Sequence, residues 1–147
     1  PCLSIHGDIP FEEQRILLRN LKQIKPKMMY VSPERLQSFF FRAAITHAEI
    51  NISQIVIDEA HCISQWGIDF RPEYGMIAPF IDFLKRQNND PVIIALTATL
   101  GKRAKEDIKM EFLISDEGEI YHPEVIRSNL TLRFQKVSQD ADKIRYK

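Results

Sequence analysis

Short apolar runs alternate along this chain with longer stretches of helical periodicity, and this alternation is the feature that most restricts the fold. The runs are about as long as a short strand, and they lie at residues 2–5, 28–31, 55–57 and 92–96. Between them, apolar residues recur three and four positions apart, which is the spacing of one helix face. Strands that alternate with helices form βαβ units, so the sequence predicts an α/β fold with a mostly parallel sheet flanked by helices.

The helical stretches are expected at residues 11–24, after Ser32-Pro33, at 72–86 and at 102–113. In each of them the apolar positions predict the face that packs against the sheet. In chain order, the residues expected on these faces are Leu17, Leu21 and Ile24; Leu36, Phe39, Phe40 and Ala43; Tyr74, Ile77, Ile81 and Leu84; and Ala104, Ile108 and Phe112. A weaker alternation predicts a further strand at residues 130–137.

The composition is that of a folded domain with no overall preference for nucleic acid. A chain of 147 residues, 44% of them hydrophobic, can bury a core without disulfides, and no run reaches the roughly 18 apolar residues of a membrane span. Lys and Arg number 20, as do Asp and Glu, so a polyanion would have to be bound by a local patch. The two cysteines, Cys2 and Cys62, predict no zinc site and are typical of a reduced, cytosolic protein.

Two carboxylates, Asp58 and Glu59, follow directly after the buried run at 55–57. Open α/β sheets bind ligands at the carboxyl ends of their strands. In phosphoryl-transfer sites of this layout, the first acid holds Mg²⁺, usually through water, and the second polarises the attacking water. The alternative is a strand that simply ends in solvated acids, and an apolar run followed by two acids does not decide between them.

Three motifs then resemble those of one family. The letters DEAHCISQWG at residues 58–67, continued by DFRPEY at 69–74, are similar to motif II and the aromatic-rich loop of RecQ-family DNA helicases. YVSPERL at 30–36 resembles motif Ib of that family, and ALTAT at 95–99 resembles its motif III. The motifs occur in the family's order, and the resemblance covers roughly residues 27–110. It implies a RecA-like lobe of the P-loop NTPase type.

The resemblance also implies roles for individual residues near the acids. Asp58 matches the acid that holds Mg²⁺ through water, and Glu59 matches the acid that activates water for ATP hydrolysis. His61 and Gln65 match positions that sense the nucleotide and link it to the DNA side. Thr97 and Thr99 match a hydroxyl pair that relays between the nucleotide and DNA sites; by itself, Thr99 is equally explained as a helix N-cap.

A second group of residues matches DNA-contacting positions of the family. Trp66, Phe70 and Arg71 match the aromatic-rich loop that touches single-stranded DNA. Aromatic rings stack on bases without sequence preference, for about 1–3 kcal/mol per base, and Arg adds phosphate or cation–π contacts. Ser32 and Arg35 match a motif that contacts the DNA backbone, whereas Glu34 suits the N-terminus of a helix.

Two departures from the family pattern are visible. Ile68 stands where the family usually has His, which replaces a titratable group in the DNA-coupling loop by an apolar one. The phosphate-cradling loop G-x-x-x-x-G-K-[ST] is absent, because the one Gly-Lys pair, Gly101-Lys102, is followed by Arg103 and lies after the acids. The resemblance therefore predicts an N-terminally incomplete first motor lobe over residues 1–128, and a linker or the start of the second RecA-like lobe over 129–147.

These observations predict part of an ATP- and Mg²⁺-dependent 3′→5′ DNA helicase that is inactive as the isolated chain. The expected partners are ATP, single-stranded or duplex DNA and the rest of the helicase, with no membrane and no zinc in this segment. Isoleucine outnumbers leucine by 20 to 11, which points to an AT-rich bacterial genome. The resemblance to a DNA helicase implies a cytoplasmic protein associated with the bacterial nucleoid. The alternative is a non-catalytic DNA- or protein-binding module derived from a helicase lobe.

Overall fold

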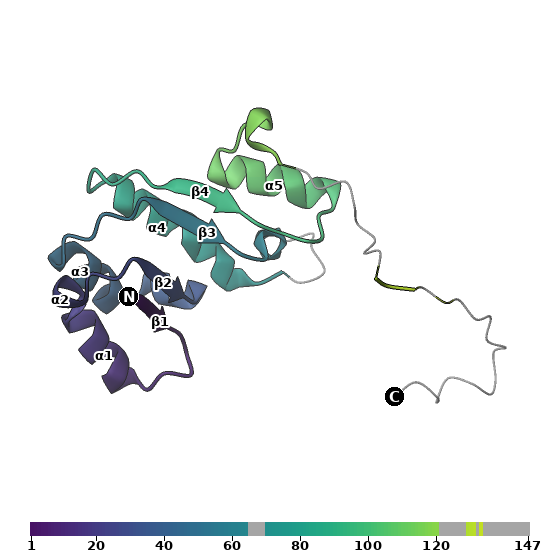
Figure 1. Cartoon of the computed structure of the whole chain (residues 1–147). Coiled ribbons are helices and arrows are strands. Elements are labelled where there is room, and N and C mark those ends of the chain that lie inside the picture. The colour runs from purple at the N-terminus through teal and green to yellow at the C-terminus, as the bar shows by residue number, and fades with distance from the viewer. Residues whose placement is uncertain (65–69, 121–128, 132, 134–147) are drawn as a thin grey trace. The chain divides into compact units, whose positions relative to one another are not determined.

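Four short strands form two parallel pairs in the computed structural model, which describes residues 1–64, 70–120, 129–131 and 133. Strand β1 (Cys2–Ile5) pairs with β2 (Met28–Val31), and β3 (Gln54–Ile57) pairs with β4 (Val92–Ala95). Helices connect the strands of both pairs (Figure 1). The mixed α/β architecture with parallel strands and flanking helices is therefore confirmed.

Five α-helices are present in the described part of the chain, together with short 3-10 helices. The α-helices are α1 (Phe11–Arg19), α2 (Leu21–Ile24), α3 (Phe39–His47), α4 (Ile77–Lys85) and α5 (Lys102–Phe112). The 3-10 helices are η1 (Pro33–Gln37), η2 (Ala60–Ile63), η3 (Pro72–Met76) and η4 (Asp116–Gly118). By its internal contacts the chain divides into one unit of residues Pro1–Asp116 and another of Glu117–Lys147. All the strands and the site described below belong to the first unit.

The helix predicted over residues 11–24 is interrupted at Asn20. The backbone of Asn20 leaves helical geometry, with φ −95° and ψ 6°, and its side-chain Nδ2 donates to the carbonyl of Ile16 at 3.0 Å. A short amide side chain that bonds its own backbone competes with the helix ladder in this way. The segment therefore forms α1 and α2, and α2 ends at Lys25, which adopts a left-handed conformation.

The buried helix face predicted after Ser32-Pro33 is wrong for three of its residues. The chain forms η1, breaks at Ser38 and begins α3 there, where the Ser38 hydroxyl accepts from the Phe41 amide at 3.4 Å. This break resets the helical phase, so α3 buries Phe41 and Ile45. Phe39, Phe40 and Ala43 are exposed instead; the exposed fraction of Phe39 is 79%.

The predicted apolar faces of α4 and α5 are confirmed. Ile77, Ile81 and Leu84 of α4 are buried, as are Ala104, Ile108 and Phe112 of α5. Tyr74 precedes α4 in η3 and is half-buried. Most of the strand predicted at 130–137 lies outside the described residues.

Two clusters of buried side chains make up the core, and α4 contributes to both. One cluster lies on β1 and β2 and includes Phe41, Ile45, Phe80 and Leu84; the other lies on β3 and includes Ile57, Ala60, Ile77, Ile81, Ile108 and Phe112. In Figure 1, α4 lies behind the β3–β4 pair, and Ile55 of β3 packs against both clusters. Helix α4 therefore joins the two strand pairs, which share no backbone ladder.

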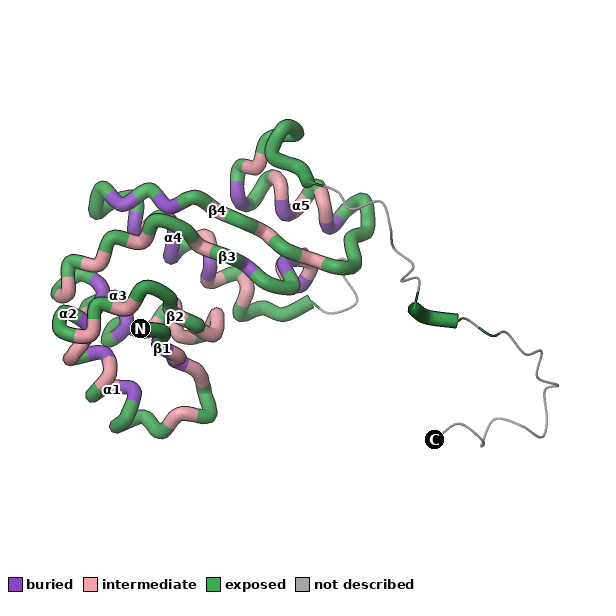
Figure 2. The backbone as a smooth tube through the Cα atoms, viewed as in Figure 1, coloured by how far each residue is buried: buried purple, intermediate pink, exposed green. Residues whose placement is uncertain are grey.

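The opposite faces of the strands carry exposed apolar side chains. Met28, Tyr30, Val56 and Val92 are each more than half exposed, and Figure 2 shows mostly exposed and intermediate residues along β3 and β4. Parallel sheets are normally covered on both faces, so this apolar surface is unusual for the fold class. Among the described residues, no helix has the length and apolar character needed to cross a membrane.

The phase reset at Ser38 predicts opposite effects for two neighbouring phenylalanines of α3. We expect Phe41→Ala to lower the free energy of unfolding by about 3–5 kcal/mol, because it empties a buried site. Phe39→Ala should change that free energy by no more than about 0.5 kcal/mol, because its ring is in solvent. Urea denaturation of the two variants measures the difference. Equal losses would show that the face predicted from the sequence is the buried one after all.

Candidate functional site

The carboxyl ends of β3 and β4 bring the predicted acids beside the predicted threonines. The two strands are parallel, and Ile57 is in register with Ala95. The ladder continues past the strands, because the amide of Leu96 donates to the carbonyl of Ile57 at 2.8 Å and the amide of Ala60 donates to the carbonyl of Leu96 at 2.9 Å. Backbone hydrogen bonds therefore join Ile57 and Ala60 to Leu96, and residues 97–99 follow directly after this connection.

The two carboxylates lie on a tight turn and face solvent. Glu59 has a left-handed backbone, with φ 48° and ψ 43°, a conformation that costs a residue with a side chain roughly 1–3 kcal/mol. Asp58 Oδ1 accepts from the Glu59 amide at 2.9 Å, which stabilises the turn. Both residues are exposed. The turn therefore presents two accessible carboxylates at the strand end, where an α/β sheet binds its ligands.

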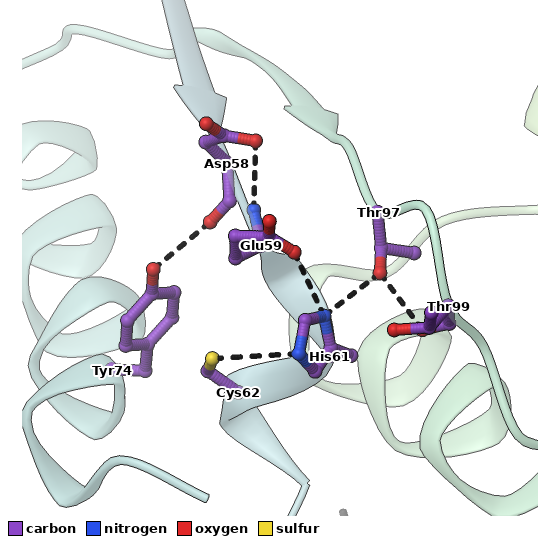
Figure 3. A network of polar contacts seen from close by, with 7 residues as sticks. All are labelled: Asp58, Glu59, His61, Cys62, Tyr74, Thr97 and Thr99. Atoms are coloured by element: carbon purple, nitrogen blue, oxygen red, sulfur yellow. Dashed lines mark hydrogen bonds and ion pairs between the residues drawn. The ribbon is translucent and has the colours of Figure 1, made fainter. Parts of the chain in front are cut away.

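His61 connects the acid turn to the segment after β4. Its Nδ1 lies 2.9 Å from Thr97 Oγ1 and 3.2 Å from Glu59 Oε2 (Figure 3). The Thr97 hydroxyl donates its single proton to the carbonyl of Thr99 at 2.9 Å, so toward His61 it acts as an acceptor. The imidazole therefore carries its proton on Nδ1. Its Nε2 lies 3.8 Å from Cys62 Sγ.

Tyr74 joins the acid turn to η3, and the sequence did not single it out for this role. Its hydroxyl donates to the backbone carbonyl of Asp58 at 3.0 Å. Burial, together with the nearby Cys62, Asp58 and Glu59, raises the pKa of the Tyr74 phenol, so the hydroxyl stays protonated and remains a donor. The motif that includes Tyr74 is visible in the sequence, but a contact with a carbonyl 16 residues away is not.

Two of the motifs matched to DNA contacts meet on one hollow of the surface. Helices η1 and η3 pack together and line a cavity of about 320 Å³ with Pro33, Glu34, Arg71, Glu73 and Tyr74. Arg71 is exposed at this hollow and Phe70, next to it, is 41% exposed. The cavity carries two carboxylates beside one guanidinium, so the positive charge of Arg71 is partly offset.

Ser32 bonds to Glu34 instead of capping the helix. Its hydroxyl donates to Glu34 Oε1 at 2.6 Å, and the side chain makes no cap with η1. This hydrogen bond lowers the pKa of Glu34, against a smaller opposing effect of burial. Arg35 lies one residue further, and its Nε is buried without a hydrogen-bond partner among the residues that the structure describes.

The structure thus brings together Asp58, Glu59, His61, Thr97 and Thr99 on one side, and Ser32, Arg35, Phe70 and Arg71 near the hollow on the other. Gln65, Trp66 and Ile68 lie outside the described residues.

An exposed carboxylate such as Asp58 fits a hydrated Mg²⁺, which usually keeps several waters and takes one or two protein carboxylates. Within residues 1–64 and 70–120, three or more His, Cys, Asp or Glu side chains do not gather into a metal-binding cluster.

Several known proteins are similar in sequence to this chain. The family model described as DEAD/DEAH box helicase matches residues 2–108. A probable ATP-dependent DNA helicase RecS of Bacillus subtilis is 35% identical over 133 residues, which cover 90% of this chain and 25% of that protein. The ATP-dependent DNA helicase RecQ of the same bacterium is 42% identical over 120 residues, covering 81% and 19%. The ATP-dependent DNA helicase Q5 of Rattus norvegicus is 30% identical over 131 residues, covering 86% and 13%.

The chain belongs to the DEAD/DEAH box helicases and, among them, to the RecQ family, as its motifs indicated. It spans a quarter or less of the length of these curated relatives.

The contact between Ser32 and Glu34 predicts a change in acid behaviour. We expect Ser32→Ala to raise the pKa of Glu34 toward 4.5, its ordinary value, because the carboxylate loses its main donor. A lowered folded-state pKa contributes stability above the unfolded-state pKa, and this stability is lost as the pH falls through the folded-state value. The variant should therefore be less stable than wild type near neutral pH, and the difference should vanish in acid.

An NMR titration of the Glu34 side-chain carboxyl carbon measures this pKa directly. Ser38→Ala is the matched control, because that hydroxyl contacts the Phe41 amide and should leave the titration of Glu34 unchanged. An unchanged Glu34 pKa in Ser32→Ala would contradict the assignment of the Ser32 hydroxyl as its donor.

Proposed function

We propose that this chain forms part of the first motor lobe of an ATP- and Mg²⁺-dependent DNA helicase that moves 3′→5′ along single-stranded DNA. The observation that carries the proposal is the contact of His61 with both Glu59 and Thr97. This single side chain joins the acid turn after β3 to the hydroxyl segment after β4. A motor must sense phosphate at the acids and pass the signal on, and a side chain shared by two adjacent strand ends is suited to this.

In this proposal the acids divide the chemistry of ATP hydrolysis. Asp58 would hold hydrated Mg²⁺, and the ion would supply positive charge beside the phosphate oxygens. Glu59 accepts a proton from the attacking water, or orients that water. The Nδ1 atom of His61 contacts both Glu59 and Thr97, so a movement of Glu59 changes the contact between His61 and Thr97. Gln65 is assigned to the same link by its position in the motif.

The DNA side of the proposal consists of the hollow between η1 and η3 and the residues beside it. Phe70 offers an exposed ring for stacking on a base, and Arg71 a cation for a phosphate. Trp66, Ser32 and Arg35 are assigned to the same surface by their motifs. Two hydrogen bonds support a connection with the acid turn: Tyr74 donates to the carbonyl of Asp58, and the amide of Arg71 donates to the carbonyl of Cys62 at 3.0 Å.

The proposal assigns residues 1–128 to the lobe, and 129–147 to a linker or the start of the second lobe. The uncovered apolar face on β2, β3 and β4 supports a lobe that further chain completes, because parallel strands are normally covered on both faces. The 147 residues contain no G-x-x-x-x-G-K-[ST] loop to cradle phosphates. We therefore propose that hydrolysis needs the remainder of the parent protein.

In the parent helicase, Glu59→Gln is expected to lower kcat for ATP hydrolysis by about 10²–10⁴-fold, the usual contribution of a general base. Binding to single-stranded DNA should persist, because Glu59 lies on the other side of the site. Glu111→Gln, an exposed change on α5, is the matched control and should retain the wild-type kcat. A Glu59→Gln enzyme with wild-type turnover would remove this residue from the mechanism.

The isolated 147-residue chain is expected to bind a labelled oligo-dT weakly and to hydrolyse no ATP. Phe70→Ala should reduce its affinity for DNA by about 5- to 150-fold, which corresponds to the loss of one stacked base. Phe39→Ala removes a more exposed ring elsewhere on the chain and should leave the affinity unchanged, as measured by fluorescence anisotropy. DNA-stimulated hydrolysis by this chain at the rate of an intact helicase would overturn the predicted inactivity. Binding of a partner protein with no measurable DNA affinity would favour the non-catalytic module.

A further inference from the structure

A partly buried hydrogen bond joins Ser64, the residue that follows η2, to α5, at the point where the chain leaves the acid site for the DNA-contacting residues. Ser64 is 1% exposed, and its hydroxyl donates to Asp107 Oδ2 at 2.5 Å. An O–H to carboxylate bond of this length belongs to the strong, charge-assisted class. The two residues are 43 positions apart, so tertiary packing alone creates the contact.

The apolar contacts between the same two elements are already extensive. Ala60 and Ile108 are buried together in the cluster on β3, and Ile63 packs against it. These contacts hold α5 on η2, but apolar packing has no preferred direction. The Ser64–Asp107 hydrogen bond adds direction, because its strength depends on distance and angle and it therefore opposes sliding and rotation of α5 against η2.

The Ser64–Asp107 hydrogen bond lies between the nucleotide side and the DNA-contacting side of the proposed motor lobe. Residues 58–64 and 96–107 are linked at one end by His61 and Thr97, next to the acids. They are linked at the other end by Ser64 and Asp107. The backbone amide of Arg71 also donates a hydrogen bond to the carbonyl of Cys62, within residues 58–64. A movement of the Thr97 segment therefore reaches α5 directly, and α5 acts on the turn that anchors Arg71.

We infer that Asp107 is a positioning residue which, through Ser64, transmits the state of the nucleotide side to the DNA-contacting side. The inference rests on the proposed function. It assigns Asp107 no contact with ATP or DNA, and it places the coupling path in α5, outside the motifs that the sequence marks. Loss of the bond uncouples the two sides: DNA still binds, but stimulates hydrolysis less.

The test uses the full-length parent with Ser64→Ala, Asp107→Ala and the double variant. Each single variant should lower the ratio of DNA-stimulated to DNA-independent ATPase rate by about tenfold or more. The loss of a hydrogen bond to a charged group changes an equilibrium constant by about this factor. The double variant should be no worse than either single one, since both remove one interaction. Glu106→Gln, an exposed neighbour on α5, should retain the wild-type ratio.

Thermal unfolding of each variant separates positioning from simple stability. Asp107→Asn keeps the size of the side chain and an acceptor oxygen. Its ratio of DNA-stimulated to DNA-independent ATPase rate should therefore lie between those of Asp107→Ala and wild type. Variants that melt earlier but keep the wild-type ratio would overturn the inference and leave a purely structural bond. Additive losses in the double variant would overturn it as well. If the wild-type parent shows no DNA-stimulated hydrolysis, the proposed function fails, and the inference fails with it.

Discussion

The parallel ladder between β3 and β4 is the constraint on which the rest of this molecule depends. It aligns Ile57 with Ala95 and continues through Leu96 and Ala60, so that both strands end at the same level. Side chains 36 residues apart in sequence, those of His61 and Thr97, are then within hydrogen-bond distance. A slip of one residue in this ladder would turn every side chain to the opposite face and would dismantle the site.

Around this ladder, the acid turn is held from three directions. Thr97 contacts it through His61, Tyr74 contacts the carbonyl of Asp58, and α5 packs against η2. The carboxylates themselves stay exposed. A strained, left-handed Glu59 can persist in such a frame, because the surrounding hydrogen bonds over-determine its backbone. Rigid support under accessible carboxylates lowers the cost of ordering a site when a ligand binds, which agrees with the proposed role of the turn.

The sequence predicted most of the elements, but not where their phase changes. The stripes of α4 and α5 repeat every three or four residues without interruption, so their buried faces followed directly from the pattern. Phe39 and Phe40 fit a helix continued from Leu36, yet Ser38 starts a new helix and turns both rings to solvent. Asn20 divides a predicted helix in the same manner. A single polar residue that bonds its own backbone is too local a signal to outweigh a periodic pattern.

In the candidate site, too, the sequence predicted some features and the tertiary structure decided others. The sequence by itself determined which residue types follow each strand, and with them the motifs of the helicase family. The roles of Asp58, Glu59 and the DNA-contacting residues remain predictions from those motifs. Only the tertiary structure decided the contact of His61 with Glu59 and Thr97, the hydrogen bond from Tyr74 to the Asp58 carbonyl and the hydrogen bond from Ser64 to Asp107. Each of these depends on two segments meeting at a particular distance, which strand register and helix packing set, and which no local pattern of residues specifies.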